Sequence, residues 1–198
     1  MAKRSHLLVR TRQLNSGTWP RGKCTATLSG HTDNVEAVAF SPDGKLLASS
    51  GNDFALWLWD VTAGKSIAQL SKRTSSDNLT FSPDGKTIIV ADSGNIHYWD
   101  VQTKKESRRI KLGLVRRERL FPHCLAYDKK GKLLAIVMSL EVEKVWDVAA
   151  DKSLHDLKYP RENIVQCVAF SPDRKVLASA DRGLCLWDIA SGRVLVNQ

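Results

Sequence analysis

Phe40-Ser41-Pro42-Asp43 returns twice in this chain of 198 residues, as Phe81-Ser82-Pro83-Asp84 and as Phe170-Ser171-Pro172-Asp173. An altered copy begins at Tyr127, and a Trp-Asp pair follows each of the four copies, 17 to 19 residues after the aromatic residue. The pairs are Trp59-Asp60, Trp99-Asp100, Trp146-Asp147 and Trp187-Asp188. Successive pairs lie 40, 47 and 41 residues apart, so the chain contains four units of one repeat.

The first unit predicts what each repeat forms. Residues 35–40 are a short run with one half-polar face, which is typical of a strand. Ser41-Pro42-Asp43-Gly44 predicts a turn, because proline restricts φ and glycine accepts a positive φ. Three further strands are predicted over 46–49, 55–59 and 67–70. Since no helical period is convincing anywhere, each unit is predicted to be four strands joined by tight turns.

With four Trp-Asp pairs, three of them after matched Ser-Pro-Asp turns, the chain resembles the WD-repeat β-propeller family. The resemblance covers about residues 22–198 and implies an all-β fold, in which each unit is a four-stranded antiparallel blade packed on its neighbours. A basic, poorly ordered N-terminal tail is expected over 1–21. An isolated outer strand is expected over 22–28, followed by four blades at about 29–70, 71–111, 112–159 and 160–198.

Four blades and one outer strand fall short of the seven blades at which this family most often closes, so an incomplete ring is expected. Three explanations remain open. The chain is a piece of a longer propeller protein, or two copies associate through exposed blade faces, or four blades are stable alone. The question matters because large contiguous apolar patches are rarely left bare.

The resemblance also implies a structural network of His31, Ser49, Asp53 and Trp59. The same residue types could suggest a catalytic triad, but their family positions favour a structural clamp. Charged residues replace His31 in the later units, and Val90 replaces Ser49 in the second, so these blades are expected to be more weakly braced. The corresponding blade residues are Trp99, Asp100, Trp146, Asp147, Trp187 and Asp188.

The sequence contains no enzyme signature such as a P-loop, H-E-x-x-H or G-x-S-x-G. We therefore expect no catalytic residue, no cofactor and no metal. The four cysteines lack metal-ligand spacing and are expected to be reduced and buried. The longest apolar run, Leu133 to Met138, is far too short for a membrane span, and a cytoplasmic protein without membrane contact is expected.

The family resemblance implies a non-catalytic scaffold or adaptor. Such propellers generally bind a protein or peptide on the face that carries the loops between blades and the turns between second and third strands. Aromatic and arginine side chains are the usual anchors of such sites. On this face the predicted partner-binding residues are Phe54, Arg116, Arg117, Phe121 and Arg161.

The alternative function is nucleic-acid or acidic-partner binding. The net charge is +9, and residues 104–119 hold eight basic and two acidic residues. This basic stripe lacks interleaved aromatic side chains on which bases could stack, so nucleic acid is not the favoured partner.

Overall fold

The computed structural model describes residues 13–18 and 23–197, except 75, 77, 93, 113, 116–117, 120–121, 139–141, 159–164 and 181–182. In this part the chain forms β-strands and no helix, which confirms the predicted all-β fold. Four sheets of four antiparallel strands follow one another along the chain, and each contains one repeat unit. We call them blades one to four.

The strands of each blade lie in sequence order across the sheet. Blade one consists of β3 (Val35–Phe40), β4 (Leu46–Gly51), β5 (Leu56–Asp60) and β6 (Lys65–Ser71). Blade two consists of β7 (Asn78–Phe81), β8 (Thr87–Asp92), β9 (Asn95–Asp100) and β10 (Glu106–Lys111). Blade three consists of β13 (Pro122–Tyr127), β14 (Leu133–Met138), β15 (Val142–Asp147) and β16 (Lys152–Lys158). Blade four consists of β17 (Cys167–Phe170), β18 (Val176–Ala180), β19 (Leu184–Asp188) and β20 (Arg193–Asn197).

Two short two-stranded sheets stand outside the blades. β1 (Gln13–Thr18) pairs with β2 (Lys23–Ser29), and residues 13–18 lie within the stretch 1–21 that was expected to be a basic, poorly ordered tail. A polar segment such as Gln13–Thr18 carries no apolar strand signal, and the pairing depends on β2 alongside it. A hairpin of β11 (Leu114–Val115) and β12 (Glu118–Arg119) occupies the long connection into blade three.

The turn between the first and second strands is the most regular local feature. Gly44, Gly85 and Gly131 adopt φ values of 72°, 71° and 67° at the same turn position, which glycine tolerates without strain. In blade one, Ser41 Oγ accepts the Leu46 amide at 2.9 Å. The predicted turns are therefore confirmed, and in blades one to three glycine occupies the position that requires a left-handed residue.

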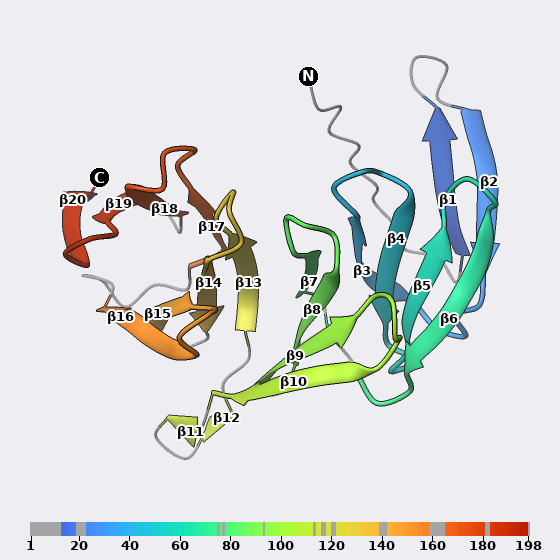
Figure 1. The fold of residues 1–198 in the computed structure, drawn as a ribbon, viewed down its shortest axis with the longest axis horizontal. Helices are drawn as coiled ribbons and strands as arrows, with labels where there is room; N and C mark the ends of the chain where they lie inside the picture. Colours follow the sequence, from blue (N-terminus) through green and yellow to red (C-terminus); the bar gives the residue numbers. More distant parts are fainter. Residues whose placement is uncertain are drawn as a thin grey trace.

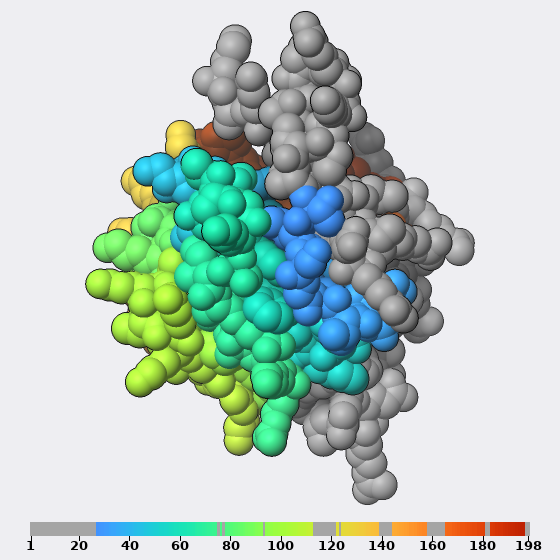
Figure 2. Space-filling model, turned by 90° about the vertical axis from the view of Figure 1, so that its right-hand side faces the viewer, coloured from blue at the N-terminus to red at the C-terminus, as the bar shows by residue number. Residues whose placement is uncertain are grey.

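The blades stand side by side in an arc (Figure 1). Their first strands contact one another in the order β3, β7, β13 and β17. In the described part of the chain β17 does not return to β3, so the ring is open, as the repeat count predicted. Figure 2 shows the described end of β2 (blue) alongside β6 (teal), at the blade-one end of the arc.

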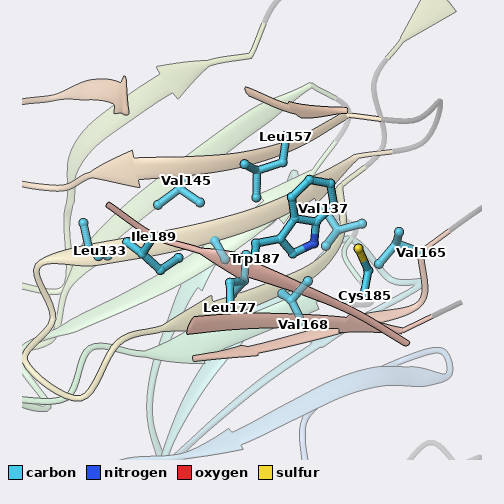
Figure 3. Packing of buried hydrophobic residues seen from close by; sticks show 11 residues of the cluster. Leu133, Val137, Val145, Leu157, Val165, Val168, Leu177, Cys185, Trp187 and Ile189 are labelled. Carbon is cyan, nitrogen blue, oxygen red and sulfur yellow. The ribbon is translucent and has the colours of Figure 1, made fainter. Parts of the chain in front are cut away.

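The core consists of the apolar layers between neighbouring blades. We call the face of a blade that turns toward the next blade its forward face, and the opposite face its rear face. Ala48 and Leu56 on the forward face of blade one are fully buried against Ile88 and Val90 on the rear face of blade two. Figure 3 shows the matching layer between blades three and four, where Trp187 packs among aliphatic side chains.

Candidate functional site

His31 lies at the centre of a hydrogen-bonded group in blade one. Its Nδ1 is 2.9 Å from Asp53 Oδ1, and its Nε2 is 2.8 Å from Ser49 Oγ. Trp59 Nε1 donates to the same Ser49 oxygen at 2.8 Å. A carboxylate only accepts hydrogen bonds, so His31 Nδ1 carries the proton and its Nε2 accepts the Ser49 hydroxyl. The structure thus joins these four residues in one directed chain from Trp59 to Asp53.

Asp53 anchors this chain to the turn between β4 and β5. Its Oδ2 accepts the Thr32 amide at 2.9 Å, and its Oδ1 accepts the Ala55 amide at 3.1 Å. Burial by itself raises the pKa of Asp53, but the hydrogen bonds from His31 and from these amides outweigh it and hold the pKa below its usual value. Asp53 is therefore an ionised acceptor at neutral pH.

Ser49 is shielded from any substrate. Its side chain is fully buried, and its oxygen is engaged by both His31 and Trp59. A Cβ at Gly30 would lie only 2.8 Å from the Trp59 ring, so glycine lets the indole close over the group. The arrangement braces the turn and presents no nucleophile at this position.

The other blades keep less of this network. In blade four, Trp187 Nε1 donates to Ser179 Oγ at 2.9 Å. The indole N–H groups of Trp99 and Trp146 find no acceptor among the described residues. At the position of Ser49 the second blade has Val90, which offers no oxygen side chain.

The aspartates of the Trp-Asp pairs cap the turn into the outermost strand of each blade. The capped amides are those of Ala63, Thr103, Ala150 and Ser191, at 2.6 to 2.8 Å from the carboxylates of Asp60, Asp100, Asp147 and Asp188. A carboxylate that accepts the amides of a turn stabilises that turn locally. These residues therefore hold the blade together at the edge opposite the His31 network.

Phe54 is the exposed aromatic residue at the turn between β4 and β5. Its φ is 60°, and 55% of its surface is accessible to solvent. Blade two has Gly94, with φ 86°, at the equivalent position five residues before the tryptophan of the pair. The turn thus requires a left-handed residue, and blade one fills it with a bulky side chain that is left in solvent.

Three loops meet around Phe54. The Asn52 amide donates to Asn34 O, and the Thr74 amide donates to Phe54 O, both at 2.9 Å. The turn of blade one therefore lies between the connection that precedes the blade and the connection that follows it. The other predicted partner-binding residues, Arg116, Arg117, Phe121 and Arg161, lie outside the part whose side chains the structure describes.

Part of the positive charge of the basic stripe is neutralised by contacts within the protein. Arg108 donates to Val148 O at 3.1 Å, forms an ion pair with Asp151, and lies 4.9 Å above the centre of the Tyr98 ring. These contacts connect blade two to blade three. Arg108 is therefore a blade-to-blade contact, a role that the sequence pattern did not predict.

Sequence reasoning also missed a charged group on blade two. His97 Nε2 lies 3.0 Å from Asp92 Oδ1, and its Nδ1 lies 2.9 Å from Glu106 Oε1. Arg109 binds both oxygens of Glu106 at 2.8 Å. The group forms because β10 pairs with β9 in a register that sets Arg109 opposite His97. No motif in the sequence predicts that register.

Among the residues that the structure describes, no cluster of three or more histidine, cysteine, aspartate or glutamate side chains could hold a metal ion. The same part of the chain contains no helix long and apolar enough to cross a membrane.

Comparisons with known proteins bear on the fold and the family. The chain is 30% identical to small ribosomal subunit protein RACK1y of Oryza sativa subsp. japonica, over 68% of this chain and 43% of that protein. It is 30% identical to the WD repeat-containing protein AAC3 of Dictyostelium discoideum, over 84% of this chain and 36% of that protein. The chain thus spans less than half the length of these relatives.

A solved structure of hydrazine synthase from Kuenenia stuttgartiensis superposes with a TM-score of 0.72 at 24% identity, over 83% of this chain and 48% of that chain, which shows a shared fold alone. The family model of the WD domain, G-beta repeat, matches residues 22–60, 67–100 and 151–188, together more than half of the chain. The unmatched stretch contains most of blade three, the unit with the altered turn and the longest spacing. With three matched repeats on four stacked blades, the chain belongs to the WD40 repeat family.

Proposed function

We propose that this protein is a non-catalytic scaffold or adaptor that binds a protein or peptide partner on the loops around Phe54. The observation that carries the proposal is an aromatic side chain that is both exposed and held in a left-handed backbone conformation. Outside glycine this conformation costs roughly 1–2 kcal/mol. Residues in such conformations cluster at functional sites, where contacts with a ligand can justify their retention.

The relatives support this class of function. RACK1y is named as a protein of the small ribosomal subunit, so a chain with a related sequence takes part in a macromolecular assembly. By that analogy we also infer a cytoplasmic location for this protein. An aromatic anchor surrounded by polar loops is a common centre of protein–protein binding energy.

Two arginines in the described part of the basic stripe are paired within the protein, which weakens the support for the alternative of nucleic-acid binding. Arg108 is held by Asp151 and Val148 O, and Arg109 is paired with Glu106. Cations that are paired within the protein release fewer counterions from a nucleic acid. A salt titration distinguishes the two functions, because affinity for nucleic acid falls steeply as the salt concentration rises.

The experiment compares Phe54→Gly with a matched control. Peptides are selected from a displayed random library on the full chain, and their affinities are measured by calorimetry. Phe54→Gly should weaken binding about tenfold or more, because it removes the anchor. Ile67→Ala, which shortens another solvent-exposed apolar side chain, on β6 of the same blade, should leave affinity unchanged.

The midpoint of thermal unfolding, measured for the parent and for Phe54→Gly, shows whether a loss of binding comes from unfolding. Glycine suits the backbone at position 54, so the variant should fold as stably as the parent or more so. Selected peptides that bind Phe54→Gly as tightly as the parent would place the binding surface elsewhere and overturn the proposal.

A further inference from the structure

The forward face of blade four is an apolar sheet surface without a covering blade. Val168, Leu177, Cys185 and Trp187 turn to the rear and pack on blade three (Figure 3). Because side chains alternate along a strand, the intervening residues turn to the forward face. These residues are Cys167, Ala169, Val176, Ala178, Ala180, Leu184 and Leu186, joined by Val196, which pairs with Leu186 across the sheet. None of these residues is charged, but the same alternation sets Asp188 at the end of β19 on this face as well, where it pairs with Arg193 of β20.

The same positions are buried in the preceding blades. Leu56 of blade one and Ile96 of blade two are both 0% exposed, whereas Leu184, at the equivalent position three residues before the tryptophan, is 45% exposed. Cys167 is exposed as well, so the expectation that the cysteines are buried is wrong at this residue. The physical reason is that no blade in the described part of the chain stands in front of blade four.

The other end of the arc offers no matching open face. On the rear face of blade one, Leu47 and Trp59 are 2% and 1% exposed, and Leu28 of β2 packs against them. Two copies therefore cannot close a ring by placing blade four of one copy on blade one of the other without displacing that cover. Each copy has a single sheet face of this kind among the described residues.

This face is complementary to itself in size. Ala169, Ala178, Leu186 and Val196 form one row across β17, β18, β19 and β20. The small members stand on β17 and β18, and the larger members stand on β19 and β20. A two-fold axis in the interface, parallel to the strands and between β18 and β19, would set β18 opposite the partner's β19. Each alanine of one copy would then face a larger side chain of the other, and interdigitated small and large residues pack densely.

We propose that a second copy of this chain covers the forward face of blade four in a two-fold symmetric dimer, with Ala178 opposite Leu186 of the other copy. An interface of this type uses the same patch on both subunits and closes at two. The centre of this face carries no charged side chain, so it sets no like charges against each other between two chains that each carry a net charge of +9.

Light scattering after gel filtration measures the mass directly. The full chain should elute with twice its mass of 22.0 kDa. Leu184→Lys places a charge in the interface and should halve the mass, while circular dichroism shows that the variant is folded. Leu154→Lys alters an exposed leucine on β16 of blade three and should leave the dimer intact.

A size swap tests the pairing itself. Ala178→Leu sets leucine against Leu186 of the other copy, so it should halve the mass although the single chain has room for the larger side chain. Ala178→Leu combined with Leu186→Ala again sets a small residue opposite a large one and should restore the dimer. In the dimer Cys167 should also react more slowly with a thiol reagent than in Leu184→Lys.

Three results would overturn the proposal. They are a parent chain of 22.0 kDa, a polydisperse mass above a dimer, and a dimer that Ala178→Leu leaves unchanged. Phe54→Gly should not alter the mass, because Phe54 lies on blade one. The dimer and the proposed partner site can therefore fail independently.

Discussion

The Arg174 guanidinium forms an ion pair with the fully buried carboxylate of Asp128 and so connects the turn of blade four to the turn of blade three. Arg174 has φ 67° and stands where the other three blades have glycine. In blade three, Asp128 Oδ1 accepts the amides of Lys132 and Leu133 at 2.7 and 2.8 Å. Ser41 and Asp43 share these two tasks in blade one. Two departures from the repeat thus compensate each other across a blade interface.

Replacement of Asp128 should destabilise the protein. Asp128→Ala leaves two turn amides and the Arg174 guanidinium without their acceptor, at a cost of about 3 kcal/mol. Arg174→Gly should cost less than Asp128→Ala, because the Lys132 and Leu133 amides still bind the buried carboxylate and glycine relieves the left-handed strain. Urea unfolding of both variants measures the difference. Equal losses would show that the ion pair, and not the two turn amides, accounts for the contribution of Asp128.

Ser49 and Ser179 provide a matched pair for the tryptophan network. Ser49→Ala leaves both the Trp59 N–H and His31 Nε2 without a partner and should cost about 2–3 kcal/mol. Ser179→Ala removes the acceptor of Trp187 and should cost about half as much. Chemical denaturation curves give both values. A Ser179→Ala loss as large as that of Ser49→Ala would contradict the role of His31.

In blade two, a hydrogen-bond acceptor can be added for the tryptophan instead of removed. Val90→Thr is nearly isosteric and supplies an oxygen at the position that Ser49 has in blade one, so it should give Trp99 Nε1 an acceptor. The gained hydrogen bond, about 1 kcal/mol, should offset the cost of burying a hydroxyl. We expect an unfolding midpoint equal to or above that of the parent. Val90→Ala, which adds no acceptor, is the control and should lower stability.

The His97 group predicts a decline in stability as the pH rises above the unfolded-state pKa of histidine, about 6.5. Burial alone lowers the pKa of His97, but the hydrogen bonds and charges of Asp92 and Glu106 outweigh it and raise the pKa above 6.5. A raised pKa means that protonation favours the folded state. This contribution is complete below the unfolded-state pKa of about 6.5 and is lost as the pH rises through the folded-state pKa.

Glu106 determines the pH below which the same group loses its contribution to stability. The hydrogen bond from Arg109, opposed by burial and aided by His97, lowers the pKa of Glu106 to about 2. Its contribution is present above the unfolded-state pKa of about 4.3 and is lost as the pH falls toward 2. Urea unfolding across the pH range should therefore show both declines. His97→Gln should abolish the decline toward high pH, and its persistence in this variant would assign that decline to another group.

The repeat pattern predicted the blades correctly because its signals are local. Proline and glycine restrict φ within a single turn, as at Gly44 and Gly85, and alternating apolar residues specify a strand such as β3 wherever it packs. Ser49 and His31, 18 residues apart, could be assigned to one network because the resemblance to the WD-repeat family implies it.

Contacts between elements were beyond the sequence, since they depend on how closely the blades approach. Arg108 and Asp151, which form an ion pair across the interface of blades two and three, are 43 residues apart in the sequence. The pairing of β1 with β2 and the group around His97 depend on strand register in the same way.

The sequence by itself thus determined the repeat, its four strands and their turns, because each is a property of a few adjacent residues. Only the tertiary structure decided which charges are paired, that Phe54 is held exposed in a left-handed turn, and that blade four leaves its forward face open. An apolar strand has the same residues whether its face is covered or bare, and only the stacking of the blades distinguishes the two.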